Sequence, residues 1–338
     1  MWSEEKLDEL LSRPGDLLIE DMKQIKGDIL VIGAGGKMGP SLCVLASRAV
    51  REAGLGIKIK AVSRFSDKSV EKYLSYNGVE CINADLLDTA QVQNLPFAGN
   101  IIYMAGKKFG TSDAEHMTWA MNAIVPSRIA EKYINSRIVV FSSGNVYPMT
   151  PVQHGGATEK TDCAPVGEYA MSCLGRERVF DYYSREHGLK CMFFRLNYAI
   201  ALRYGVLHDI AECILNGKPV NLQPTSFNCI WQRDANEVAL RGLLHCGSPP
   251  AVYNITGPET VSVKNTAVQM AELLGKNLSF TDEEQPSALL SNAGKSFSTF
   301  GYPSVTLGTM IKWQTEWLCG GGSTLGKPTH FEERDGKF

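Results

Sequence analysis

Residues 28–39 read DILVIGAGGKMG, an apolar run followed at once by a cluster of glycines. The run has the length of a buried strand, and Gly33, Gly36 and Gly39 follow it at the spacing G-x-x-G-x-x-G. One glycine makes the tight turn, one lets the backbone approach a pyrophosphate, and one lets the next helix pack closely on the strand. Because the N–H groups of that helix then face the anion, the stretch predicts a dinucleotide-binding loop.

Strand-like and helix-like segments alternate after this loop. Short apolar runs rich in Ile and Val lie at residues 57–62, 79–83, 100–105, 137–143 and 190–196, and amphipathic segments of helix length separate them. This alternation predicts an α/β fold, a Rossmann-type doubly wound parallel sheet with helices on both faces.

The segments also indicate how the chain is divided. Residues before the first strand carry helical periodicity in LDELL and IEDMKQI, which favours helices over a disordered leader. After residue 196 the pattern becomes mixed, with strand-like runs at 227–232 and 251–256. The expected division is an N-terminal helical extension (1–26), a dinucleotide-binding domain (27–196, with 228–256 returning to it), and a smaller C-terminal substrate-binding region with a tail (197–227 and 257–338).

Charge and composition exclude several classes of partner. The 338 residues carry a formal net charge of −2, and dispersed charges of this kind predict no nucleic acid and no membrane surface as partner. The N-terminus lacks the apolar run of a signal peptide, and no stretch is apolar for long enough to span a membrane. The nine cysteines show no CxxC and no metal-type spacing, which predicts reduced, mostly buried thiols and no metal site. We therefore expect a cytoplasmic protein.

The end of the second predicted strand bears on the choice of dinucleotide. The strand ends in Ser63 and Arg64, where an acidic residue would bind the adenosine ribose hydroxyls of NAD. Arg64 fits a 2′-phosphate, or it stacks on the adenine as a solvated loop residue. The sequence therefore predicts NADP or NAD as cofactor and favours NADP. Asp85 and Leu86, after the third strand, are placed to contact the adenine, and a surface turn is the alternative interpretation of Asp85.

From about residue 28 to residue 256, the chain resembles the extended short-chain dehydrogenase/reductase family, of the NAD(P)-dependent sugar epimerase and dehydratase type. The matching features are the glycine loop, Asp85, MAGKKFG (104–110), Asn122, FSSGNVYP (141–148), Tyr169, RLN (195–197) and IWQRDANEVA (230–239). The resemblance implies these cofactor-binding residues: Gly33, Gly36, Lys37, Met38, Gly39, Ser63, Arg64, Asp85, Leu86, Ala105, Gly106, Asn122, Tyr169 and Cys173.

The resemblance also implies that Ser143 and Tyr169 are catalytic. In the family the tyrosine exchanges a proton with a substrate hydroxyl or carbonyl, and the serine hydroxyl polarises the same oxygen. A lysine four residues after the tyrosine binds the nicotinamide ribose and lowers the pKa of the phenol. Here Cys173 holds that position, so the motif Y-x-x-x-K is Y-x-x-x-C.

A neutral thiol does not favour the tyrosinate as an ammonium would. Three substitutes are open: Lys107 or Lys108 could reach the phenol from the loop after the fourth strand, the charge of an oxidised nicotinamide could act alone, or Tyr169 could work as a neutral proton donor. Cys173 itself is better interpreted as a small helix residue beside the cofactor than as a nucleophile, because no base is near it in sequence.

On the substrate side, the resemblance implies that Ser143, Asn197 and Trp231 contact the ligand, and the sequence adds Lys107 and Arg203 as further candidates. The alternatives are a capping role for Asn197, a surface position for Arg203 and a core position for Trp231. The tail from Gly320 is either a mobile end or a segment that folds across the pocket, or onto a neighbouring subunit, and contributes His330 or Arg334.

The functional expectation is an NAD(P)-dependent epimerase, dehydratase or related oxidoreductase acting on a sugar or a sugar-derived polyol. The family resemblance further implies a homodimer, paired through the two long helices that precede and contain the catalytic tyrosine. The missing lysine leaves a second class open, a dinucleotide-binding sensor or regulatory protein without redox turnover. A simple NADPH-dependent ketone reductase is the third hypothesis.

Overall fold

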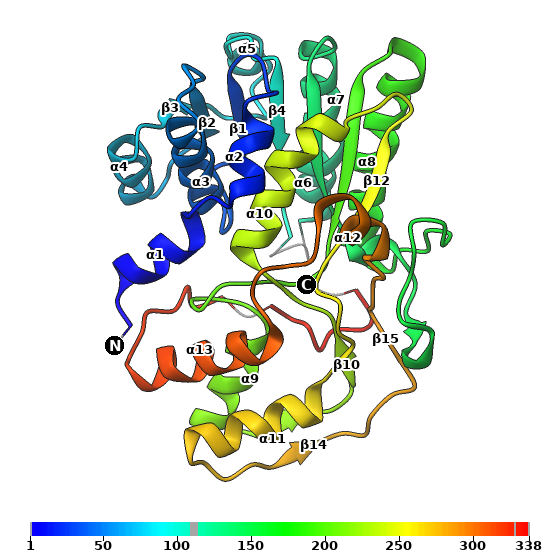
Figure 1. Cartoon of the computed structure of the whole chain (residues 1–338). Coiled ribbons are helices and arrows are strands. Elements are labelled where there is room, and N and C mark those ends of the chain that lie inside the picture. Colours follow the sequence, from blue (N-terminus) through cyan, green and yellow to red (C-terminus); the bar gives the residue numbers. More distant parts are fainter. Residues whose placement is uncertain (1, 109–113, 328, 337–338) are drawn as a thin grey trace.

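The computed structural model describes residues 2–108, 114–327 and 329–336. At its centre is a seven-stranded sheet of order β12-β7-β5-β4-β1-β2-β3, in which all neighbouring strands are parallel (Figure 1). Its strands are β1 (Ile29–Ile32), β2 (Ile59–Ser63), β3 (Glu80–Asn83), β4 (Asn100–Tyr103), β5 (Arg137–Ser143), β7 (Lys190–Leu196) and β12 (Ala251–Ile255). The predicted doubly wound α/β fold is confirmed.

Helices cover both faces of the sheet because its strands are apolar on both sides. In β1, Ile29 and Val31 face one layer, and Leu30 and Ile32 face the other. The first layer contains α2 (Asp16–Met22), α3 (Gly39–Glu52), α4 (Lys68–Tyr76), α10 (Gln232–Arg241) and α12 (Gly294–Phe300). The second contains α5 (Thr89–Gln93), α7 (Val125–Lys132) and α8 (Gly167–His187), with α6 (Glu115–Trp119) and η1 (Ala120–Ile124) preceding α7.

A second hydrophobic core lies below the carboxyl ends of the strands. It is built mainly by α9 (Val206–Leu215), α11 (Val263–Leu274) and α13 (Leu307–Cys319), which form the lower lobe in Figure 1. Four two-stranded pairs surround it: β8 (Ala199–Ile200) with β11 (Ile230–Trp231), β10 (Ser226–Phe227) with β13 (Val261–Ser262), β9 (Val220–Asn221) with β14 (Phe280–Thr281), and β6 (Thr150–Pro151) with β15 (Ser287–Ala288). Three short turns complete the list: η2 (Gly144–Val146), η3 (Val152–His154) and η4 (Gly242–His245).

Two sequence expectations need correction here. The predicted strand 227–232 is split between β10 and β11, which pair with different partners outside the central sheet. All nine cysteines are free, but four are buried, four are partly exposed and Cys319 is exposed, so fewer thiols are buried than predicted.

The N-terminal residues form α1 (Glu4–Ser12) and α2, which belong to different cores. Leu7 and Leu11 of α1 pack into the lower core, whereas Leu18 and Met22 of α2 pack on the sheet layer. The extension therefore joins the two lobes on one side of the molecule (Figure 1). Within the described ranges, no helix has the length and hydropathy that crossing a bilayer requires.

Candidate functional site: a dinucleotide loop facing a buried tyrosine

The glycine loop connects β1 to α3 at the carboxyl edge of the sheet. Gly33 has φ +91°, a conformation that favours glycine, and a Cβ there would lie 2.5 Å from the Ala105 nitrogen. A Cβ on Gly39 would lie 2.2 Å from the Ala34 carbonyl oxygen, so this glycine is required for close packing of α3 on the loop. The exposed Gly36 has room around it, since a Cβ there would meet only one atom, at 3.5 Å.

The first turn of α3 has free capacity for an anion. Its N-cap residue is Met38, no side chain caps the helix, and Pro40 stands in its first turn. The N–H groups there thus lack a side-chain acceptor, which is the arrangement that binds the diphosphate of a dinucleotide. These residues fit NAD or NADP by the shape of the loop and by the open helix terminus.

Lys37 leaves the same loop and extends to the lower lobe. Its ammonium lies 3.3 Å from the ring centroid of Tyr204, in cation–π contact. Burial, followed by the neighbouring charges of Lys108 and Lys327, lowers the pKa of Lys37 to about 7. Lys37 therefore connects the glycine loop to the lower lobe.

The sequence predicts that the termini of β2 and β3 hold the adenine end of a dinucleotide. Ser63 approaches the glycine loop so closely that a Cβ on Gly35 would lie 2.4 Å from its hydroxyl oxygen. Arg64 is exposed, and its backbone carbonyl accepts a hydrogen bond from the Asn83 amide at 3.0 Å. Asp85 makes a turn, with its carboxylate accepting the Leu87 N–H at 2.9 Å, while Leu86 is buried in the sheet layer.

The loop after β4 is held in place by one buried side chain. Asn122 accepts a hydrogen bond from the Lys107 N–H at 3.0 Å and donates one to the Lys107 carbonyl at 3.1 Å. It also donates to the Ser172 hydroxyl at 2.8 Å. Asn122 lies in η1, a π-helical turn, a distortion that is frequent at functional sites. The backbone around Ala105 and Gly106 is thereby fixed beside α8.

Ser143, Tyr169 and Cys173 come together at the end of β5 and the start of α8. The phenol of Tyr169 is in hydrogen-bond contact with both the Ser143 hydroxyl and the Cys173 thiol. Burial is the main reason that the pKa of Tyr169 lies well above its usual value, and Cys173 raises it further. At neutral pH the phenol is therefore protonated and ready to donate a proton to an oxygen placed between Tyr169 and Ser143.

Two cations approach this tyrosine. The ammonium of Lys108 lies 5.9 Å from the Tyr169 ring centroid and donates to the Thr329 carbonyl at 3.2 Å. Burial lowers the pKa of Lys108 to about 8. The guanidinium of Arg176 is bonded to Asn122 Oδ1 at 2.6 Å and to the Phe141 carbonyl at 2.7 Å. Lys107 is held through its backbone by Asn122, and of the two predicted lysines Lys108 is the one whose ammonium approaches the Tyr169 ring.

Behind the serine lies a buried ionic network. Glu177 of α8 accepts two hydrogen bonds from Arg195 of β7, at 2.9 and 2.6 Å, and a third from the Ser142 hydroxyl at 2.5 Å. Arg195 also donates to the Tyr147 hydroxyl at 2.6 Å, which in turn donates to Asn254 at 2.9 Å. The network ties α8 to the carboxyl ends of β5, β7 and β12.

Two predicted substrate residues lie elsewhere and are corrected. Arg203 is paired with Asp8 of α1 at 2.8 Å and with Glu4, so its charge serves to hold the N-terminal extension. Trp231 is 1% exposed and packs edge-on against Trp313 in the lower core, at 5.4 Å between ring centroids.

Another predicted substrate residue, Asn197, stays close to Ser143. Asn197 is buried, and its amide donates to the Leu289 carbonyl at 3.3 Å. A Cβ on Gly144, the residue after Ser143, would lie 3.3 Å from its side chain. Asn197 therefore lies behind residues 143–146, the predicted catalytic turn, next to Leu289, which lines a cavity under the C-terminal segment.

The C-terminal segment 324–336, of which residue 328 is not described, runs between the lobes, as the red trace near the C-terminus shows (Figure 1). Thr329 bonds Asp209 of α9 through both its N–H, at 2.8 Å, and its hydroxyl, at 2.5 Å. At the other end, a Cβ on Gly167 would lie 2.4 Å from the Gly336 carbonyl oxygen, so the segment reaches the start of α8. The tail thus packs on both lobes, in line with the interpretation that it folds back onto the protein rather than forming a mobile end.

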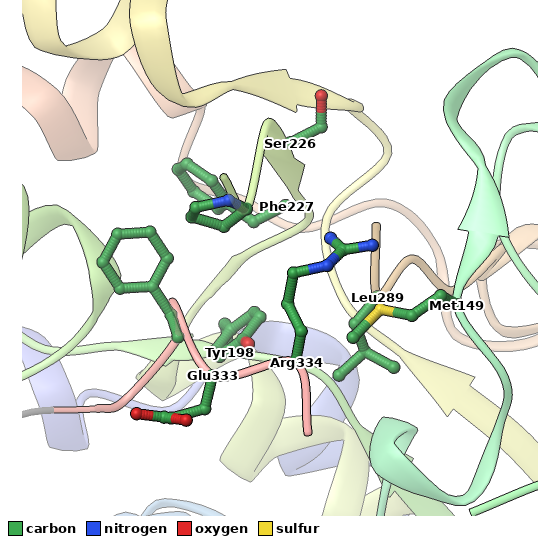
Figure 2. A pocket seen from close by; sticks show the side chains of 9 residues that line it. Met149, Tyr198, Ser226, Phe227, Leu289, Glu333 and Arg334 are labelled. Atoms are coloured by element: carbon green, nitrogen blue, oxygen red, sulfur yellow. The ribbon is translucent and has the colours of Figure 1, made fainter. Parts of the chain in front are cut away.

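A small cavity lies under this segment. Figure 2 shows Arg334 and Glu333 from the tail, Phe227 from β10, and Met149, Tyr198 and Leu289 from the surrounding loops. The side chains of Glu333 and Arg334 extend from the tail in different directions. Among the described residues, the acceptors of Arg334 are neutral: the Ser287 carbonyl at 2.8 Å, the Ser287 hydroxyl at 3.0 Å and the Gln223 carbonyl at 3.4 Å.

Comparison with family models decides the classification. The model of the NAD dependent epimerase/dehydratase family matches residues 29–266, more than half of the chain. The chain belongs to this family. The epimerase/dehydratase match begins at β1 and extends beyond β12, so it covers the complete sheet. Direct comparison with curated protein sequences finds no match.

Solved structures similar to this epimerase/dehydratase family member share its fold at low sequence identity. A UDP-glucose 4-epimerase from Thermotoga maritima with UDP-glucose has 18% identity and a TM-score of 0.70, covering 87% of this chain and 99% of its own. A UDP-glucuronic acid 4-epimerase from Bacillus cereus, with NAD, has 16% identity, a TM-score of 0.70 and the same coverage. A dTDP-glucose 4,6-dehydratase from Streptomyces venezuelae, with NAD, has 16% identity and a TM-score of 0.71, covering 87% and 97%.

Several side chains of the candidate site in this epimerase/dehydratase family member received no role in the sequence analysis. Arg176, Glu177 and Arg195 are buried together around the catalytic turn. For Arg176 the sequence gives a partial indication of its position in the site, because it follows Cys173 by three residues and therefore lies on the same helix face. The pairing of Glu177 with Arg195 joins a helix to a strand and has no local sequence signal.

Proposed function

We propose that the protein is an NAD(P)-dependent epimerase or dehydratase that acts on a nucleotide-linked sugar. The observation that carries this proposal is the contact of the buried Tyr169 phenol with the Ser143 hydroxyl, at the same sheet edge as the glycine loop. A protein that only binds a dinucleotide has no need of a phenol and an alcohol converging on one point.

The residues have distinct roles in this proposal. The loop 33–39 and the first turn of α3 hold the diphosphate, and Asn122 fixes the backbone at residue 107 beside the cofactor. Bound NAD(P) supplies the acceptor and donor of hydride. Tyr169 transfers the proton to and from the sugar oxygen, and Ser143 donates a hydrogen bond to the same oxygen.

The substrate class is argued from charge and from similar folds. Arg334 places a cation beside the cavity, and the oxygens that it bonds among the described residues are neutral, which favours a ligand with phosphate groups. The structures of similar fold include a UDP-glucose 4-epimerase with UDP-glucose and a UDP-glucuronic acid 4-epimerase with a UDP-linked sugar. These observations support a nucleotide sugar over a free sugar.

The test is to incubate the protein with NAD⁺ or NADP⁺ and a panel of UDP- and dTDP-hexoses, with the free hexoses as matched controls. We expect conversion of at least one nucleotide sugar without net cofactor consumption. Chromatography measures the conversion, and the absorbance of the reduced nicotinamide measures the consumption of cofactor. Net consumption of NADPH with a ketone would instead identify a reductase. Tight cofactor binding without conversion of any sugar would favour the sensor hypothesis, for which Cys173 at the lysine position is the supporting observation.

The preference for NADP over NAD is a separate prediction that rests on Arg64. The structures of similar fold contain NAD and give this preference no support. If Arg64 binds the 2′-phosphate, Arg64→Ala weakens NADPH binding about tenfold, the value of one lost charge-assisted contact, and leaves NADH binding unchanged. Fluorescence titration with NADPH and NADH measures the two affinities. Equal weakening of both affinities, or no change in either, would show that Arg64 does not bind the 2′-phosphate.

We also propose that the protein is a homodimer. Four large apolar side chains are exposed on the helices that precede and contain Tyr169: Trp119, Ile124, Met171 and Tyr182. Exposed apolar groups gathered on neighbouring helices are typical of a protein interface. Sedimentation equilibrium should give twice the chain mass, and a monomer at micromolar concentration would contradict the proposal.

A further inference from the structure

Arg176 is a buried arginine whose bonded partners are all neutral. Its side chain is 6% exposed. Nη1 donates to the Phe141 carbonyl and Nη2 to Asn122 Oδ1, while Nε has no hydrogen-bond partner among the described residues. A full positive charge is therefore enclosed beside the catalytic turn.

Carboxylates neutralise the other two buried arginines of the described residues. Arg195 is paired with Glu177 at 2.6 Å, and Arg241 with Asp21 at 2.7 Å. In the part of the chain that the structure describes, no carboxylate lies within ion-pair distance of Arg176. Arg176 meets two neutral oxygens and the face of the Tyr103 ring, whose centroid lies 5.9 Å from Cζ. None of these groups neutralises a buried positive charge, so the charge is available to an anion that forms while the protein works.

The position of Arg176 indicates which anion this is. Arg176 follows Cys173 by three residues on α8, which puts the two side chains on one face of the helix, a turn apart. The guanidinium also reaches the carboxyl end of β4, since a Cβ on Gly106 would lie 2.4 Å from Nη2. Burial raises the pKa of Tyr169, and the Arg176 charge acts against that rise.

We propose that Arg176 is a positioning residue that supplies, from one turn further along α8, the buried positive charge that a lysine at residue 173 would supply. The proposal rests on the proposed function. When the O–H bond of Tyr169 breaks, the proton goes to the sugar oxygen and the electron pair stays on the phenolate, which Arg176 stabilises. The reverse transfer restores the phenol.

The other groups near Tyr169 are neutral or are bonded to another residue. Ser143 and Cys173 contact the phenol, and Glu177 is already neutralised by Arg195. Lys108 approaches the ring from the loop after β4, but its ammonium is bonded to the C-terminal segment at Thr329. Lys108 therefore provides the matched control, a second cation removed from the same site.

The first test measures ionisation of the phenol without any substrate. Ultraviolet titration of each protein minus that of its Tyr169→Phe counterpart isolates this one tyrosine. We expect its ionisation to begin about one pH unit higher in Arg176→Met than in the parent, with Arg176→Lys and Lys108→Met close to the parent. Coincident curves, including no ionisation up to about pH 11 in any protein, or a shift in Lys108→Met alone, would overturn the proposal.

The second test is a rescue by charge at the motif position. Arg176→Met should lower the rate of sugar conversion at neutral pH about tenfold and move the pH–rate profile upward by about one unit, with KM within about twofold. Adding Cys173→Lys to this variant should restore the profile. If the double variant folds but does not recover the pH–rate profile of the parent, the proposal is overturned. If Arg176→Met does not fold, Arg176→Gln, which keeps an amide donor, takes its place.

The two tests separate this inference from the proposed function. If no nucleotide sugar is converted but the phenol titration shifts as expected, Arg176 acts on Tyr169 and the assigned reaction is wrong. If conversion occurs and the titration does not shift, the reaction stands and the role of Arg176 is wrong.

Discussion

Tyr169→Phe is expected to lower the rate of nucleotide-sugar conversion about 10³-fold, because the change removes the group that exchanges the proton with the sugar oxygen. The ring keeps its packing against Cys173 and the surrounding core, so affinity for NAD(P)H should stay within about twofold of the parent. Single-turnover absorbance of the bound nicotinamide measures the rate, and fluorescence titration measures the affinity.

A matched control is present on the same helix. Tyr182 of α8 is 56% exposed and lies far along the helix from the catalytic turn, so Tyr182→Phe should leave the rate unchanged. If Tyr169→Phe converts nucleotide sugars at a rate close to that of the parent, Tyr169 is not the proton-transfer residue and the proposed chemistry is wrong.

Glu177→Ala is expected to destabilise the protein by about 3–5 kcal/mol, the range found when one partner of a buried ion pair is removed. The substitution leaves the Arg195 guanidinium without its carboxylate in a site that is 5% exposed, and it takes away the acceptor of the Ser142 hydroxyl. The free energy of unfolding from urea denaturation measures the loss.

The control for this prediction is the exposed pair Asp181–Arg185 on α8, whose atoms lie 2.8 Å apart. Asp181→Asn should change the free energy of unfolding by no more than about 0.5 kcal/mol, because solvent screens the pair. A similar small loss for both variants would show that the Glu177–Arg195 pair does not hold the sheet and α8 together.

The features predicted well from the sequence are those set by local pattern. Apolar runs of strand length and the glycine spacing at Gly33, Gly36 and Gly39 suffice to predict the sheet and its loop, because each signal lies within a dozen residues. The meeting of Ser143 and Tyr169 followed from the family resemblance, and the structure places the two side chains in contact.

The features that sequence missed depend on contacts between distant segments. Arg203 is followed by ordinary loop residues, and only the folded chain brings Glu4 and Asp8 of α1 to it. The sequence leaves Trp231 open between the substrate wall and the core, and only the folded chain shows that Trp313 of α13 covers it. The route of the tail between the lobes likewise depends on the distant acceptor Asp209, which the sequence pattern does not single out.

The central claim is that the loop 33–39 holds a dinucleotide whose nicotinamide faces Tyr169 and Ser143. A crystal structure of the protein grown with NADH or NADPH tests this most directly. The account predicts density for the diphosphate at the first turn of α3 and for the nicotinamide ring next to the Tyr169 phenol. Density for the dinucleotide elsewhere, none at all at saturating concentration, or a Tyr169 side chain turned away from the ring would contradict it.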